Sequence, residues 1–225
     1  MSLLRIDNEI VDESVQIKEG ETLSLNWATF ENGKPCKLEV KVFKNAIFNM
    51  AFADFGSWDG QAQITVELME EGAEFNFHCA SLSSVNQNKT IRVDCIHRSP
   101  RTHSLISNYG IASDDAQIHF EGSSHILRGS IGSYTRQEAK AILFDALSQG
   151  YCSPVLKIDE NDIEASHAAS VGRVNDDHLF YMLSRGLSKE EARKIIIMGY
   201  LKPIAAYFDE DEMKERIANA IEERI

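Results

Sequence analysis

The chain has 225 residues, of which 43% are hydrophobic and 26% charged, a composition typical of one large or two modest globular domains. Its net charge of −12 argues against a surface that binds nucleic acid or an anionic membrane, because such surfaces need clustered lysine and arginine. No apolar run approaches the roughly 20 residues of a bilayer span. The first residues, MSLLRIDNEI, lack the pattern of a signal peptide, so we expect a cytoplasmic protein.

The cysteines are too scattered to form a short metal or redox motif. Cys36, Cys79, Cys95 and Cys152 contain no C-x-x-C pair, which argues against a zinc knuckle or a thioredoxin-like site. We expect Cys36, Cys79 and Cys95 to be free, buried thiols, the usual state of cysteine in a protein of this kind. Phosphate-binding glycine patterns are also absent from the sequence, so the chain is not expected to bind ATP itself.

Short segments in which apolar and polar residues alternate fill the chain from about residue 10 to residue 165. They lie at 15–17, 23–27, 38–42, 64–68, 75–79, 91–95, 105–107, 118–120, 126–127, 156–158 and 163–165, with a continuous apolar patch at 46–52. Turn residues separate them, with one tight turn expected at 31–34. The pattern is typical of an all-β protein and leaves a sandwich, a barrel and a solenoid open. The lack of a strict hexapeptide repeat argues against a regular left-handed β-helix.

One segment, 135–148, is ambiguous, because its composition suits a helix but also two strands broken near Asp145. After it and the last short strands, the pattern turns helical, and we predict helices over 176–185, 188–206 and 209–224. Ser188 and Glu191 have the spacing of a capping box, and Gly186 can end the preceding helix in a left-handed conformation. Pro203 is expected to kink or end the second helix. The predicted apolar faces are Leu179, Phe180 and Leu183, then Ala192, Ile195, Ile196 and Gly199, then Met213, Ile217, Ala220 and Ile221.

Three runs near the carboxyl end carry a resemblance to a known family. They are PVLKI at 154–158, SHAASVG at 166–172 and LFYMLSRGL at 179–187, followed by Glu191 and Ala192. Together they resemble the carboxy-terminal region of the SufB/SufD family, scaffold proteins of the SUF iron–sulfur cluster assembly system. The resemblance implies a mainly β fold, in which a right-handed parallel β-helix over 1–170 is followed by a small helical domain over 171–225. It also implies strand, rather than helix, at 135–148.

The same resemblance implies a function. Members of the family bind an ABC-type ATPase, SufC, through their carboxy-terminal helices, so we expect a scaffold that works beside a SufC-like ATPase and is not itself an enzyme. It is expected to pair either with a second copy or with a SufB-like sister chain. No tightly bound cofactor is expected, although an iron–sulfur cluster can be held transiently. The chain is shorter than typical members, and we expect it to work without their amino-terminal helical part.

His167 is the main candidate ligand for iron or a nascent cluster, because its sequence context matches the functional histidine of the family. The alternative is a histidine satisfied by backbone hydrogen bonds at a domain junction. Some relatives have a cysteine two residues earlier, where this chain has Ala165. Others have a glutamate directly after the histidine, where this chain has Ala168. Both differences weaken direct cluster chemistry at this position.

Cys152 is the second candidate for holding iron or a cluster, since thiolates are the preferred ligands of iron–sulfur clusters and SufB has a cysteine nearby; the alternative is a passive thiol. Phe180, Tyr181 and Arg185 are the predicted partner contacts, because aromatic residues and arginine are enriched at interface hot spots. The alternative for Phe180 is a place in the core.

A second reading of the strand-rich pattern is a β-solenoid that acts on or binds carbohydrate. It would need carboxylates gathered on one face of the solenoid. The acidic candidates are Asp114, Asp115, Glu121 and the turn at 159–162. Turns are commonly acidic for solvation alone, so the family resemblance favours the scaffold.

Overall fold

A computed structural model describes residues 1–7, 12–31, 33 and 36–224. Asn32 and Lys34, in the tight turn predicted at 31–34, lie outside these residues. The strands of one sheet are β1 (Ser2–Ile6), β3 (Thr22–Thr29), β5 (Ile47–Asp54), β7 (Glu74–Ser83), β9 (His103–Ala112), β11 (Ser133–Leu143) and β13 (Ile163–Arg173). Those of the other are β2 (Asp12–Ile17), β4 (Cys36–Val42), β6 (Gly60–Leu68), β8 (Asn88–His97), β10 (Gln117–Ile126) and β12 (Gln149–Ile158).

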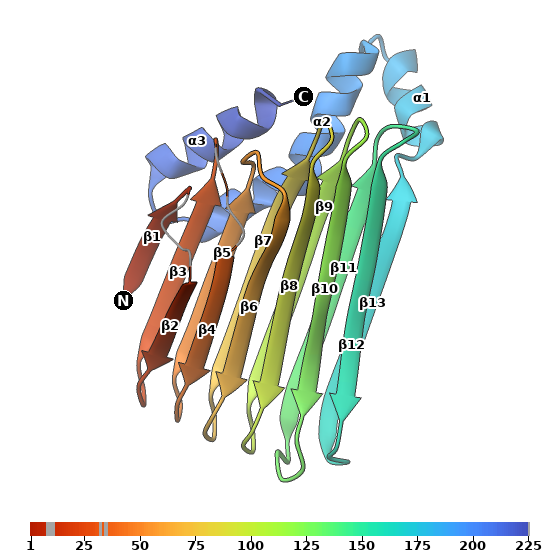
Figure 1. The fold of residues 1–225 in the computed structure, drawn as a ribbon. Helices are drawn as coiled ribbons and strands as arrows, with labels where there is room; N and C mark the ends of the chain where they lie inside the picture. The colour runs from red at the N-terminus through yellow and green to blue at the C-terminus, as the bar shows by residue number, and fades with distance from the viewer. Residues whose placement is uncertain (8–11, 32, 34–35, 225) are drawn as a thin grey trace.

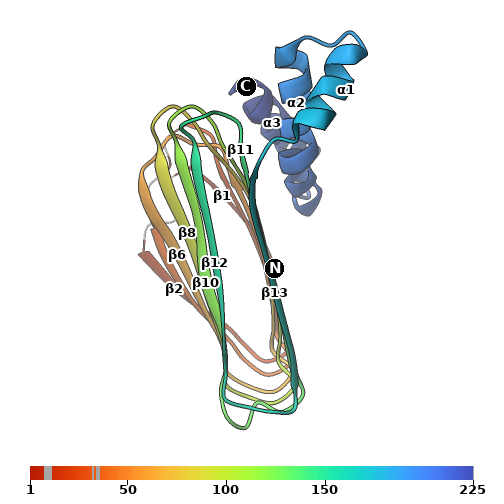
Figure 2. The same cartoon turned by 90° about the vertical axis from the view of Figure 1, so that its right-hand side faces the viewer.

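The two sheets form a parallel β-solenoid. Odd-numbered strands follow one another in one sheet and even-numbered strands in the other, and neighbours within each sheet pair in parallel. Consecutive strands therefore alternate between the sheets, and each pair of strands makes one coil (Figure 1). Figures 1 and 2 together show that the chain winds right-handed as it advances from β1 to β13. The solenoid is thus the correct choice among the three architectures that the strand pattern left open.

Register places chemically similar side chains above one another inside the solenoid. One inner ladder runs coil by coil through Leu25, Met50, Phe77, Ile106, Gln137 and His167. The first four positions are buried and apolar, so the amino-terminal coils share a continuous hydrophobic core. Burial of such side chains contributes about 25 cal/mol for each Å² removed from water. The ladder becomes polar at Gln137, close to the carboxy-terminal end of the stack.

A buried ion pair ties the two sheets together. The Lys89 ammonium of β8 lies 3.0 Å from the Asp54 carboxylate of β5, and both side chains are fully buried. The carboxylate also accepts hydrogen bonds from Thr29, Trp58 and Ser81 at 2.6–2.7 Å. The ammonium donates to the carbonyls of Gly56 and Leu82 at 2.7 and 2.8 Å. Burial lowers the pKa of Lys89, and the nearby Asp54 carboxylate opposes this shift. The opposite charges and their hydrogen bonds together offset the desolvation cost of burying both groups.

The carboxy-terminal part is helical, as predicted. It comprises α1 (Asp176–Ser184), α2 (Lys189–Leu201), the 3-10 helix η1 (Lys202–Tyr207) and α3 (Asp211–Glu222). The capping box of Ser188 and Glu191 is present, and Gly186 has the expected left-handed φ of 94°. Pro203 stands in the first turn of η1, so the α-helix ends at Leu201 and the prediction of one helix to residue 206 was too long. No helix of the described chain has the length and apolarity needed to cross a membrane.

The helices cover the outer face of the odd-numbered sheet (Figure 2). Small residues on that face, among them Ala51, Ala53 and Ala80, pack in one cluster with buried helix residues. On α3 the buried face is Met213, Ile217 and Ile221, as predicted. The strand β13 runs to Arg173 and α1 begins at Asp176, so the strand-to-helix transition falls between these two residues.

Two predicted helix faces were wrong. On α2 the buried residues are Ala192, Ile197 and Leu201, whereas Ile195 is 49% exposed. On α1, Leu183 is 40% exposed. The buried side of α2 is decided by its contact with the sheet, which local periodicity does not contain.

Segment 135–148 is only partly strand. Strand β11 ends at Leu143, and residues 144–148 form the loop that leads to β12. Helix propensity is overridden up to Leu143 because β11 pairs with β9 on one side and β13 on the other.

Replacing Lys89 with methionine should lower the free energy of unfolding by about 3–5 kcal/mol, because it leaves the Asp54 carboxylate buried without its counter-charge. Lys214→Met is the matched control, since Lys214 pairs with Asp211 at the surface and its loss should cost less than about 1 kcal/mol. Urea unfolding followed by circular dichroism measures both. Equal effects of the two substitutions would contradict the structural role assigned to the buried pair.

Candidate functional site

The described solenoid ends in two edge strands. Strand β12 is last in the even-numbered sheet and β13 is last in the odd-numbered sheet. Pro154 lies within β12, where a residue without a backbone N–H is tolerated because edge strands have donors that face away from the sheet. The final coil therefore presents backbone groups and side chains that no further coil covers.

His167 lies on the inner side of this final coil. It is in register with Gln137 of β11, whose side chain is buried within the solenoid. Since parallel partners point to the same face of a sheet, the imidazole faces the end of the lumen. The residue is exposed because the coil that would cover it is absent from the described stack. This position suits a ligand that a second molecule can reach.

Inside the solenoid, next to the final coil, polar side chains form a hydrogen-bonded network. The Gln137 amide donates to Ser124 Oγ at 2.8 Å and to the Val155 carbonyl of β12 at 3.0 Å. Thr135 also donates to Ser124, and its hydroxyl lies 2.7 Å from the hydroxyl of Ser104. One of these contacts, from Gln137 to Val155, reaches the last coil itself, which also pairs with β10 and β11 through its backbone.

His97 belongs to the same polar network and has a structural role. Its Nδ1 lies 2.8 Å from the Thr102 hydroxyl and its Nε2 lies 3.0 Å from the Ser104 hydroxyl. Burial, with help from His103, lowers its pKa to about 4, so it is neutral at physiological pH. Both ring nitrogens are occupied by protein partners, which leaves neither for a metal.

Cys152 faces the same lumen from the opposite sheet. It is in register with the buried Phe120, and its thiol donates to the Ser170 carbonyl of β13 across 3.8 Å. Burial raises its pKa to about 11. The thiol is therefore protonated at neutral pH and must lose its proton before it can ligate iron. The other three cysteines are buried, as predicted.

Both iron candidates are thus on the inner side of one coil, but from different sheets. The two residues do not form a metal centre by themselves, since the described chain contains no group of three or more His, Cys, Asp and Glu placed to hold a metal ion.

The predicted partner contacts lie together on α1 and at its C-cap residue, Arg185. Phe180 is 73% exposed and Tyr181 is 58% exposed, so the alternative of a core position for Phe180 is wrong. The Arg185 guanidinium donates to the Tyr181 hydroxyl at 3.2 Å and lies 5.3 Å from its ring centre. This contact holds an aromatic and a cationic group side by side on an exposed helix, a combination common at interfaces.

Sequence reasoning missed the exposed apolar side chains of the last coil. Tyr151 and Val155 on β12 and Val171 on β13 are 43–50% exposed. Pro154 was the available signal, because a proline inside a strand marks an edge. An edge strand with apolar side chains is a surface prone to association with another strand.

The carboxylates that a carbohydrate-active solenoid would need are spread over the molecule. Asp114 and Asp115 lie in the turn between β9 and β10, at the opposite end of the strands from the 159–162 turn (Figure 1). Glu121 is on the outer face of β10, with its carboxylate 3.7 Å from the Arg92 guanidinium. The arrangement does not bring these groups into one cleft.

Comparison with known proteins agrees with the resemblance. Residues 30–200 match the family model described as SUF system FeS cluster assembly, SufBD core domain. The chain is 29% identical over 209 residues to the iron–sulfur cluster assembly protein SufD of Bacillus subtilis, covering 93% of this chain and 46% of the relative. It is 28% identical over 178 residues to a SufBD family protein of Staphylococcus saprophyticus, covering 79% of this chain and 38% of the relative.

A third relative, a SufBD family protein of Mycobacterium tuberculosis, is 30% identical over 120 residues, which are 53% of this chain and 14% of that protein. The chain thus spans less than half the length of these relatives. The family model nevertheless covers most of the solenoid, all of α1 and all of α2 except its last residue. The solenoid with its helical tail belongs to the SufBD core domain family of the SUF iron–sulfur cluster assembly system.

Proposed function

We propose that this chain is a non-catalytic scaffold subunit of a SUF assembly complex. It pairs with a second β-solenoid chain at its open end and holds a SufC-like ATPase through its helical tail. The observation that carries the proposal is the position of β13, which supplies His167 to the open end and leads directly into α1. A movement of the tail is thereby passed to the strand that bears the candidate ligand.

Pairing at the open end follows from the two edge strands. Unpaired backbone groups on β12 and β13 and the exposed Tyr151, Val155 and Val171 favour a partner that adds its own strands. The partner is either a second copy of this chain or a SufB-like sister chain. Both are solenoids of the same family and can offer matching edges.

A cluster held there is a transient cargo of the complex. Iron–sulfur clusters are usually held by several cysteine thiolates, sometimes with histidine in their place. This chain offers His167 and Cys152, so the partner chain must complete the ligand set. Burial keeps the Cys152 thiol protonated in this structure, and a shift of β13 that loosens its contact with Ser170 would expose the thiol to water and ease loss of its proton.

The ATPase contact is assigned to α1. This helix contacts α2 and leaves Phe180 and Tyr181 in solvent, so its apolar side chains are free for a partner. Burying large aromatic side chains against a partner is strongly favourable in free energy, so their exposure on a helix is typical of a binding surface. Docking here places the ATPase next to the strand-to-helix transition at the end of β13.

Replacing both Phe180 and Tyr181 with serine should weaken binding of a SufC-like ATPase at least about ten-fold, because aromatic hot spots each contribute about 2 kcal/mol or more. Isothermal titration calorimetry with the purified ATPase measures the loss. Ile131→Ser is the control, since Ile131 is 50% exposed but lies in the turn between β10 and β11, at the end of the solenoid away from α1. Unchanged affinity of the double variant would place the ATPase elsewhere.

Lysine at both Val155 and Val171 should reduce chain–chain association at least about ten-fold, because buried lysines at a strand edge carry a large desolvation cost. Sedimentation velocity of the chain alone, and of its mixture with a SufB-like chain, distinguishes self-pairing from pairing with a sister. Val85→Lys is the control, because Val85 is 65% exposed in the turn between β7 and β8. Association that survives the edge substitutions argues for a different interface.

Anaerobic reconstitution with iron and sulfide tests the cluster ligands. In the complex with ATPase and partner chain, His167→Ala and Cys152→Ser should each lower the affinity for iron at least about ten-fold. Removing a residue that merely hydrogen-bonds to a metal ligand commonly lowers metal affinity by about this factor, and removing the ligand itself should lower it at least as much. Visible absorbance and bound iron are measured. His103→Ala, an exposed histidine at the start of β9, is the control. Wild-type cluster content in His167→Ala would remove that residue from the proposed ligand set.

A further inference from the structure

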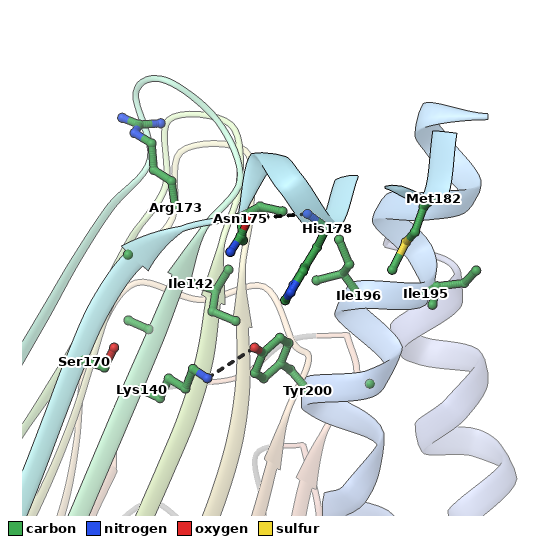
Figure 3. A pocket seen from close by; sticks show the side chains of 14 residues that line it. Lys140, Ile142, Ser170, Arg173, Asn175, His178, Met182, Ile195, Ile196 and Tyr200 are labelled. Atoms are coloured by element: carbon green, nitrogen blue, oxygen red, sulfur yellow. Dashed lines mark hydrogen bonds between the residues drawn. The ribbon is translucent and has the colours of Figure 1, made fainter. Parts of the chain in front are cut away.

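A cleft separates the outer face of the odd-numbered sheet from helices α1 and α2 (Figure 3). Its volume is about 490 Å³, within the range of pockets that hold small molecules. The cleft lies on the opposite side of β13 from the solenoid lumen, because Lys140 and Ser170 point outward where their strand neighbours point inward. It is therefore separate from the candidate site of His167 and Cys152.

The lining of the cleft, on both the sheet side and the helix side, is rich in hydrogen-bond donors. Its polar side chains are Lys140, Ser170, Asn175, His178 and Tyr200. The Lys140 ammonium donates to the Tyr200 hydroxyl at 3.2 Å and lies 4.5 Å from the centre of that ring. Across the described residues, no carboxylate forms an ion pair with Lys140, and none of the side chains that line the cleft is acidic. A half-buried cation without a counter-charge is a favourable place for an anion.

Neighbouring groups add to this preference. Asn175 caps α1 with its side-chain oxygen, which accepts from the backbone N–H groups of Asp177 and His178. Its amide NH₂ is therefore left to donate elsewhere, and Figure 3 shows it at the top of the cleft, with the His178 ring directed toward Tyr200. Arg173 does not take part, because its guanidinium turns away to the carbonyls of Asp145 and Ala146.

The remaining lining is apolar and comes from both the sheet and the helices. It comprises Ile142 of β11, Met182 of α1, and Ile195 and Ile196 of α2. Gly172 and Gly199 also border the cleft, and a Cβ atom built on either would meet nothing within 4 Å. The space beside these glycines is thus open, and a planar or aliphatic group can lie there against the isoleucines.

We propose that this cleft binds a small organic acid, with its phosphate or carboxylate at Lys140 and Tyr200 and its apolar body against the isoleucines. The ligand would contact the sheet through β11 and β13 and the tail through α1 and α2, so it would brace the tail against the solenoid. The proposal does not depend on the scaffold function or on any cluster ligand.

Phenyl phosphate and phenylacetate are suitable probes, and benzyl alcohol is the uncharged analogue. Isothermal titration calorimetry on the full chain should detect both anions or one of them, but not the alcohol. Lys140→Met should weaken anion binding more than ten-fold, because a hydrogen bond to a charged group contributes about 1.5–3 kcal/mol. Comparison of the two probes identifies whether phosphate or carboxylate is preferred.

Gly199→Leu provides a test that keeps every polar donor. Leucine suits the interior of α2 better than glycine, so the variant should fold, while its side chain fills the cleft and abolishes binding. Lys41→Met, an exposed lysine of β4, is the charge control and should bind as the wild type does. Each bound anion should also raise the thermal midpoint of the wild type and of Lys41→Met, but not of Gly199→Leu. Absence of binding by both anions, or equal binding by Lys140→Met, overturns the proposal.

Discussion

In-register parallel pairing is the constraint on which the rest of the structure depends. Each coil rests on the one before it, so an inward side chain stacks on its partner one coil earlier, as Phe77 does on Met50. A stack built this way has no internal reason to stop, and its last coil must present whatever its inward positions carry. In this chain those positions carry His167 and Cys152 in place of further large apolar residues. Architecture and candidate chemistry are therefore two consequences of the same hydrogen-bond ladder.

Local patterns in the sequence predicted much of this fold and failed at identifiable points. Two-residue alternation located most of the strands because one face of each is buried in the core. It did not distinguish a solenoid from a sandwich, since the partner of each strand lies a whole coil away along the chain. For the same reason the buried face of α2 was misassigned. Ile197 and Leu201 are buried because they pack on the alanine-rich outer face of the sheet, and the sequence of the helix alone does not show this contact. Caps are local, and Ser188 and Gly186 were predicted correctly.

The candidate site was predictable in part as well. His167 was singled out by its resemblance to a family motif, whereas its exposure follows from being on the last coil, a fact of pairing and not of local sequence. The buried hydrogen bond between Gln137 and Ser124 could not be predicted from the sequence, because isolated polar residues in strands ordinarily face outward. The cleft around Lys140 and Tyr200 joins residues 60 positions apart, so it emerges only when the tail is folded onto the sheet.

The two faces of β13 connect the open end of the solenoid with the helical tail. On its inner face the Ser170 carbonyl accepts from the Cys152 thiol, and on its outer face the Ser170 side chain borders the cleft under α1. An edge strand is paired on one side alone, so β13 is held less firmly than any strand within the sheet. A force applied to α1 would be transmitted first to β13, because only Val174 and Asn175 lie between the helix and this strand. The preceding coils contain the buried Asp54–Lys89 pair and a continuous apolar core, so they are held more firmly than the last coil.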